Sequence, residues 1–327
     1  MRFALSSSRI NMAAFASVLL CLTMFACRLA VTKRPNILFI LTDDQDVHMQ
    51  SLENMPLVQQ YLVTATIAQW PYAALQERPY GPEELLTIQT LPMSFLRMQG
   101  GADWIAELPL LNDTVIAYGD QYQRARLRAL QSVDKMVEGL VTHLESMGLL
   151  DNTYIFYTTD NGYHIGQHRL LPGKACGYET DINIPLIVRG PHVAKNATKV
   201  AISSHADFAP TIMSLAGQQL DDKYEFDGVP IPIYEGFTDS PKQENVDVET
   251  WGQLDIEGQY SYSYGIASSI GTYKSVRVIG ESYILYYSVW CSNEKEYYNM
   301  EADPRQVTNL LSSNATATAK SKRWPRR

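Results

Sequence analysis

Two short groups of acidic and amide side chains each follow an apolar run. Asp43 and Asp44 come directly after the run at residues 37–41, and Asp160 and Asn161 come directly after "YIFYTT". Carboxylate and amide oxygens are hard donors, which suit Ca²⁺ or Mg²⁺ better than metals that prefer thiolate or imidazole. The spacing therefore indicates a calcium or magnesium site. The alternative is that these side chains are solvated or cap the helices that follow.

A second set of reactive side chains follows a few residues later. Lys174 stands two positions before Cys176, and a neighbouring ammonium lowers the pKa of a thiol, as in an activated nucleophile. A packed thiol, or a disulfide partner for Cys291, is the interpretation that we favour for Cys176. His168 is expected to be a structural hydrogen-bonding group rather than a catalytic one.

Buried strands are predicted to position the acidic side chains. The unbroken apolar run at residues 37–41, "YIFYTT" and "INIPLIVRGP" are each typical of a strand that is buried on both faces. Open α/β sheets place their ligand sites outside the carboxyl ends of their strands. Because the first two of these strands end at Thr42 and Thr159, both acidic groups are expected at one edge of the sheet.

Two helices are predicted to cover this sheet. The first spans residues 122–147 and ends at Gly148, and its apolar side chains recur at steps of three and four: Leu127, Leu130, Val133, Val137, Leu140 and Leu144. The second is "HADFAPTIMSLAG", with Pro210 in its first turn and Gly217 as its stop. The alternation of strands and helices predicts an α/β fold with a mostly parallel central sheet covered by helices.

The character of the sequence changes after about Gly228. "YKSVRVIGESYILYYSVW" alternates and is rich in Tyr, Val and Ile, which predicts two antiparallel strands joined by a turn at Gly280 and Glu281. We therefore expect a small antiparallel C-terminal subdomain. The predicted organisation is a leader at 1–30, an α/β domain at 31–228 with an irregular region at 64–101, the C-terminal subdomain at 229–311 and a disordered tail at 312–327.

The N-terminus predicts entry into the secretory pathway. Arg2 and Arg9 precede an apolar stretch at residues 12–27, which is short for a membrane span and typical of a signal peptide removed near Ala30. A retained signal anchor is the alternative. Three N-glycosylation sequons agree with a secreted protein, and they begin at Asn112, Asn196 and Asn314.

The composition limits the classes of partner. The 327 residues are 46% hydrophobic and 19% charged, with a formal net charge of −8. This is the composition of a globular protein, and the negative charge argues against a nucleic-acid-binding surface. We expect no nucleic-acid partner and no stable membrane insertion.

Five segments, taken in order, resemble the sulfatase family of the alkaline-phosphatase superfamily. They are "RPNILFILTDDQD", "YIFYTTDNGYHIGQHRLLPGK", "INIPLIVRGP", "DFAPTIMSLAG" and "YYSVWCSNEKEYYNMEADPRQVTNL". The resemblance is to fungal arylsulfatases and glucosamine-6-sulfatases, and it covers residues 34–63 and 104–311. It implies an alkaline-phosphatase-like fold and a secreted sulfuric ester hydrolase, with an aryl or aminosugar sulfate as the small-molecule substrate.

The resemblance also assigns roles to individual residues. It implies a Ca²⁺ site with four ligands: Asp43, Asp44, Asp160 and Asn161. Lys174 matches the lysine that contacts the sulfate ester, where a cation stabilises charge on the transferred group. His164 matches a histidine on the substrate side.

One part of the family pattern is missing from the sequence. The family carries a Cys-x-Pro-Ser-x-Arg segment whose cysteine is converted to a formylglycine nucleophile, and this chain has no such segment. The chain departs from the family pattern at Thr64, where that segment is expected. The sequence therefore leaves two hypotheses: a calcium-dependent sulfuric ester hydrolase, or a catalytically inactive remnant or truncated gene product. A phosphatase or phosphonate hydrolase of the same superfamily is a weaker third hypothesis.

Overall fold

The computed structural model describes residues 34–62, 102–174, 176–198, 202–220, 225–237, 243–252, 255–256, 271–280 and 282–312. The predicted leader, most of the irregular region at 64–101, the tail from residue 313 and the sequon at Asn314 lie outside these residues. The chain from Asn36 onward forms one compact unit.

The central sheet has three described strands, β1 (Asn36–Thr42), β2 (Thr153–Thr159) and β4 (Leu186–Arg189), in the order β1-β2-β4. Strands β1 and β2 are parallel, whereas β4 is antiparallel to β2. A parallel return needs a long crossover, usually a helix, and the chain between β2 and β4 contains only the short η5 (Gln167–Arg169), β3 (Gly173–Lys174) and α5 (Glu179–Ile182). The α/β class is confirmed, and the described part of this sheet is mixed rather than mostly parallel.

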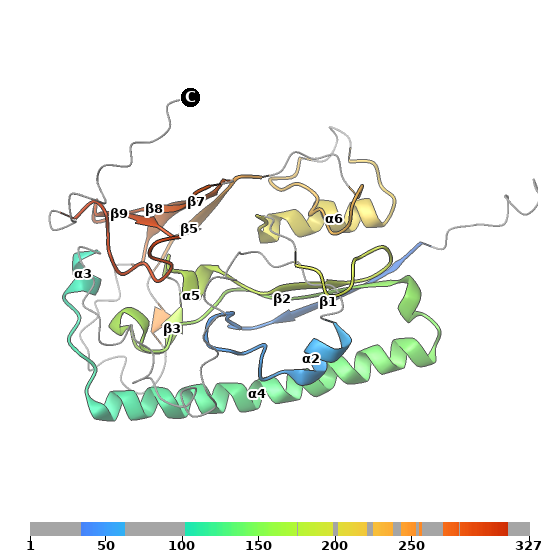
Figure 1. The fold of residues 1–327 in the computed structure, drawn as a ribbon, viewed down its shortest axis with the longest axis horizontal. Helices are drawn as coiled ribbons and strands as arrows, with labels where there is room; N and C mark the ends of the chain where they lie inside the picture. The colour runs from blue at the N-terminus through green and yellow to red at the C-terminus, as the bar shows by residue number, and fades with distance from the viewer. Residues whose placement is uncertain are drawn as a thin grey trace, which may run out of the picture. The chain divides into compact units, whose positions relative to one another are not determined.

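Helices lie on both faces of this sheet, as Figure 1 shows. Helices α2 (Pro56–Tyr61) and α4 (Asp113–Ser146) pack on the face that carries Ile155 and Tyr157. Helix α6 (Phe208–Leu215) packs on the opposite face with Phe156. Since successive side chains of a strand point to opposite faces, the continuous apolar run of β2 supplies both cores.

Helix α4 is longer than the apolar periodicity predicts. It begins at Asp113 rather than near Tyr122, because the Asn112 side chain caps it by accepting a hydrogen bond from the Val115 amide at 3.0 Å. It ends as predicted, with Gly148 at φ +65° just beyond it. The additional turns matter for the site, because they lie beside the loop after β1.

The predicted antiparallel C-terminal unit is confirmed. Its four strands are β5 (Asn245–Thr250), β7 (Tyr273–Ile279), β8 (Ile284–Trp290) and β9 (Lys295–Asn299), paired antiparallel in the order β5-β7-β8-β9. The Gly280 amide donates to the Tyr283 carbonyl at the predicted turn. One face packs with α3 (Asp103–Ala106), where the Trp104 and Trp290 rings meet edge to face.

Two remaining features bear on the sequence predictions. Strand β3 pairs antiparallel with the two-residue β6 (Asp255–Ile256), so the chain around Lys174 is joined to a segment about 80 residues later. Cys176 is buried and Cys291 is exposed, and both are free thiols, so the disulfide alternative is not realised. Within the described parts of the chain, no helix combines the length and the apolar character needed to cross a bilayer.

Candidate active site

The acidic side chains after β1 and β2 meet at one edge of the central sheet. Because Thr42 pairs with Thr159 at the end of the parallel ladder, Asp43 and Asp160 follow at the same level. Carboxylate oxygens of Asp43, Asp44 and Asp160 all lie within 4.8 Å of one another. Residues more than 100 positions apart thus form one acidic cluster.

Backbone amides hold Asp160 at the centre of this cluster. One carboxylate oxygen, Oδ1, accepts hydrogen bonds from the amides of Asp44 at 3.0 Å and Asn161 at 2.8 Å, and from the Thr159 hydroxyl at 3.2 Å. Burial opposes ionisation of Asp160, but these hydrogen bonds outweigh it and lower the pKa of its carboxyl below the usual value. Asp160 is therefore a preorganised anion.

Lys174 places a positive charge on the cluster. Its ammonium lies 2.9 Å from Asp44 Oδ1 and 3.8 Å from Asp43 Oδ1. Burial acts to lower the pKa of Lys174, but the hydrogen bond to Asp44 and the charges of the three carboxylates raise it overall. The pKa of Asp43 is raised, first by the charge of Asp44, then by burial and by Asp160. This repulsion marks a site with an excess of negative charge.

The donor set fits a calcium ion. Three carboxylates against one ammonium leave two negative charges, which match a divalent cation, and all the donors are hard oxygens. Asn161 faces the cluster with its amide nitrogen, which donates to Asp44 Oδ1 at 2.6 Å. Ligation by Asn161 requires its amide oxygen, so the side-chain amide has to rotate by half a turn.

A cavity of about 550 Å³ opens beside the cluster. Its charged lining side chains are Asp160, Lys174, Asp181, Asp247, Glu249 and Arg277. His205 also lines it and is oriented by a 2.8 Å hydrogen bond between Nε2 and the Thr159 carbonyl, while Phe208 and Val246 supply apolar wall. A sulfated ring has both polar and apolar surface, and this lining offers both.

Arg277 is a cavity residue that the sequence analysis missed. It pairs with the buried Glu179, and burial lowers the pKa of its guanidinium to about 9. A signal was present: Arg277 occupies an inward position of β7, with the same alternation as the buried Tyr273, Ser275 and Ile279. A charged side chain on the buried face of a strand indicates a partner or a cavity.

Comparison with known proteins decides the family. A sequence model described as "Sulfatase" matches residues 67–218. A sulfatase of Metarhizium majus is 41% identical over 67% of this chain and 45% of its own length. The chain belongs to the sulfatase family. The matched range begins within the segment 64–101, which we expected to depart from the family pattern.

Two further similarities bear on this sulfatase. The N-acetylglucosamine-6-sulfatase of Bos taurus is 38% identical over 64% of the chain and 40% of its own length. A structure solved with its substrate D-glucosamine-2-N,6-O-disulfate superposes with a TM-score of 0.52 and 27% identity, covering 64% of this chain and 40% of that one. The sulfatase chain thus spans less than half the length of the relatives it matches here.

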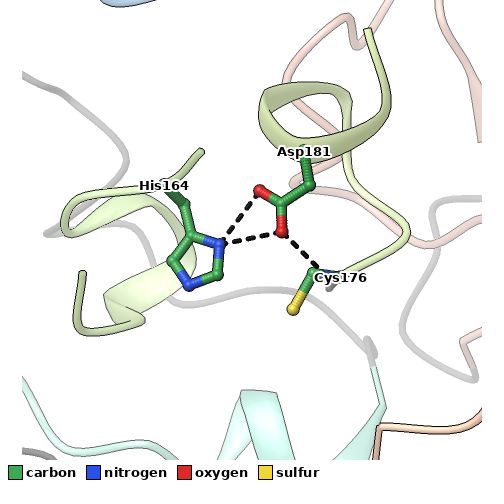
Figure 2. Close-up of side chains that lie close together, drawn as sticks. All are labelled: His164, Cys176 and Asp181. Carbon is green, nitrogen blue, oxygen red and sulfur yellow. Dashed lines mark hydrogen bonds and ion pairs between the residues drawn. The ribbon is translucent and has the colours of Figure 1, made fainter. Parts of the chain in front are cut away.

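His164 of this sulfatase lies behind the cavity wall (Figure 2). Its side chain is 0% exposed, and Nδ1 contacts both carboxylate oxygens of Asp181 at 2.9 and 3.0 Å. Its backbone pairs with Gly173 in both directions, at 3.0 and 3.1 Å. The structure therefore places His164 next to the chain that carries Lys174, rather than in the cavity itself.

Cys176 is a packed thiol in this sulfatase. Burial, followed by the charges of Asp181 and Glu296, raises its pKa well above the usual value, so the nucleophilic thiolate is disfavoured. Figure 2 shows Cys176 beside Asp181, whose Oδ2 accepts a hydrogen bond from the Cys176 amide at 2.8 Å. Asp181 Oδ1 also accepts from the Thr180 hydroxyl at 2.9 Å. The cluster of His164, Cys176 and Asp181 is thus already hydrogen-bonded around its carboxylate.

His168 supports the same region by packing. It is buried and stacks on Tyr178, with ring centroids 4.1 Å apart and planes at 23°. Burial, aided by His164, lowers the pKa of His168 from 6.5 to about 3. His168 is therefore neutral in the folded protein at neutral pH.

We expect the stability of this sulfatase to fall with pH because His168 resists protonation in the folded state. Between pH 6.5 and about 3 the unfolded chain binds the extra proton, so the free energy of unfolding decreases as the pH falls. The contribution is about 1.4 kcal/mol per pH unit. Urea unfolding from pH 7 to pH 4 should show a smaller slope in His168→Gln. The exposed His143→Gln is the control, and equal slopes in all three proteins would contradict the expectation.

Proposed function

We propose that this chain binds a calcium ion and a sulfate ester in the manner of a sulfuric ester hydrolase of the arylsulfatase type. The observation that carries the proposal is the meeting of Asp43, Asp44 and Asp160 with Lys174 at the rim of a cavity. The substrate class is an aryl or aminosugar sulfate. The aminosugar alternative is supported by the similarity to an N-acetylglucosamine-6-sulfatase.

Each part of the site has a defined task in this proposal. The three carboxylates hold the ion, with Asn161 as a fourth ligand after rotation of its amide. The ion supplies positive charge that polarises the sulfate oxygens. Lys174 adds a fixed positive charge at the same place, where it stabilises charge on the transferred group. The apolar wall at Phe208 and Val246 contacts the organic part of the ester.

Turnover distinguishes two candidate functions of this site. Hydrolysis is favoured by membership of the sulfatase family. Binding without turnover is favoured by the four cysteines, at positions 21, 27, 176 and 291, because none of them begins a Cys-x-Pro-Ser-x-Arg segment. For the sequence as it stands we favour binding without turnover. Secretion remains a prediction from the leader; the sequon residues Asn112 and Asn196 are exposed.

Calcium should stabilise the wild-type protein and should not stabilise Asp160→Asn. A ligand that binds only the folded state adds about 2.7 kcal/mol at a concentration one hundred times its Kd. The substitution keeps the shape of Asp160 but removes the charge at the centre of the cluster. Urea unfolding with and without calcium measures the difference.

The matched control is Asp247→Asn, which removes a carboxylate from the wall of the same cavity but not from the cluster. It should respond to calcium as the wild type does. Equal calcium stabilisation of wild type and Asp160→Asn would refute the proposed metal site.

A further inference from the structure

Helix α4 contacts the loop after β1 through Arg126. The guanidinium Nη1 lies 2.7 Å from Asp46 Oδ2, and Nη2 donates a hydrogen bond to the Asp44 carbonyl. The Arg126 side chain is 11% exposed and that of Asp46 is 0% exposed. One side chain of the helix thus grips the backbone of a cluster residue and a buried carboxylate two residues later.

The same helix face also contacts the loop after β2. The Arg126 guanidinium lies over the Tyr163 ring, 5.2 Å from its centroid. Tyr122, one turn earlier on the helix, stacks on Tyr163 at 6.0 Å with planes 5° apart, and the two hydroxyls are hydrogen-bonded at 2.8 Å. Gln123 adds a hydrogen bond to the Met49 carbonyl at 3.0 Å. The loops that carry Asp43 and Asp44, and Asp160 and Asn161, are therefore both held by α4.

The backbone of Asp44 shows what this contact achieves. Its φ is +57°, a left-handed conformation that is uncommon for a residue with a side chain and persists when the surroundings hold it. The Asp44 amide is held by Asp160, and the Asp44 carbonyl is held by Arg126. With both peptide groups fixed, the Asp44 carboxylate points to Lys174 and into the cluster.

We propose that Arg126 is a positioning residue for the calcium site, which sets the conformation of Asp44 through its carbonyl and through Asp46. The inference rests on the proposed calcium site. Arg126 contacts no bound group itself, and it acts through the orientation of a ligand. Partners behind metal ligands commonly change metal affinity by about 10- to 100-fold when they are replaced.

Arg126→Lys tests this role. Lysine keeps the positive charge but loses the planar fork that reaches Asp46 and the Asp44 carbonyl together. We expect calcium to bind about 10- to 100-fold more weakly, measured by isothermal titration calorimetry. Asp46→Asn, which removes the partner of Arg126 and leaves Arg126 in place, should weaken calcium binding in the same direction and serves if Arg126→Lys does not fold.

Asp134→Asn is the control for general destabilisation. Asp134 lies on the same helix and is buried, and its carboxylate accepts the amides of Leu57 and Val58 at 3.1 and 2.7 Å, away from the acidic cluster. This variant should lose stability in urea without calcium and keep wild-type calcium affinity. That split between stability and affinity supports the positioning role.

Two outcomes overturn the inference while the calcium site stands. One is wild-type affinity in Arg126→Lys, and the other is an equal loss of affinity in Asp134→Asn. A wild-type protein that does not bind calcium overturns the proposed site and the inference together. The calorimetric titration of the wild type therefore separates the two failures.

Discussion

Purified protein supplied with calcium and 4-methylumbelliferyl sulfate should release 4-methylumbelliferone no faster than the Asp160→Asn variant does. The acidic cluster and Lys174 stabilise charge, but neither attacks sulfur. Loss of the nucleophile in well-studied hydrolases costs on the order of 10⁶ in turnover. The expected rate is therefore lower by about that factor than for a sulfatase that carries the formylglycine motif. Release of the fluorescent product, followed continuously, is the measurement.

Binding has to be shown in the same samples so that a low rate is not mistaken for a misfolded protein. The sulfate ester should raise the melting temperature of the wild type in the presence of calcium, and a sulfatase with the complete motif provides the positive control. Turnover that disappears in Asp160→Asn would contradict our expectation and restore the hydrolase hypothesis. If Cys176→Ser also abolished that turnover, the buried thiol would be the nucleophile.

Glu296→Gln should be among the most destabilising single substitutions in the chain. The buried Glu296 carboxylate accepts five hydrogen bonds, and its donors are the Ala102 amide, the Tyr178 and Tyr298 hydroxyls, the Ser288 hydroxyl and the Trp290 indole. Glutamine replaces one acceptor oxygen by an NH₂ group that faces other donors. Hydrogen bonds to charged groups contribute about 1.5–3 kcal/mol each, and breaking a buried charged network costs about 3–5 kcal/mol.

Chemical unfolding in urea checks this expectation. Glu301→Gln removes an exposed carboxylate just beyond the same strand and should leave the unfolding midpoint unchanged. A midpoint in Glu296→Gln equal to that of the wild type would show that the five donors find other acceptors. The comparison tests whether one carboxylate holds β8, β9, α3 and the chain after Lys174 together.

The acidic cluster was accessible from the sequence because its logic is local. Each pair of polar residues follows an apolar strand, and parallel neighbours end at the same edge, so Asp43 and Asp160 are expected to meet. The register of β1 and β2 gives this arrangement directly. The C-terminal sheet was accessible for a similar reason, since alternation and a glycine turn are properties of a short stretch.

The contacts that support the cluster were not accessible in this way. Arg126 and Asp46 are 80 residues apart, and no periodicity relates them. The position of His164 behind the cavity depends on Asp181, which lies 17 residues later at the end of an irregular segment. Strand β4 shows the same limit, because its apolar run predicts a buried strand but not its direction. These features depend on tertiary packing, which leaves a weak local signal.

The pairing of β3 with β6 has a consequence for how the protein divides into parts. The composition changes near Gly228, yet Lys174 lies in the strand that pairs with residues 255–256, and the Tyr178 hydroxyl is anchored on Glu296. A fragment that stops at residue 228 would keep all four predicted calcium ligands and would lose both anchors of the lysine segment. The two halves of the sequence are thus not interchangeable modules: the metal ligands come from the first half, and the support for the sulfate-binding lysine comes from the second.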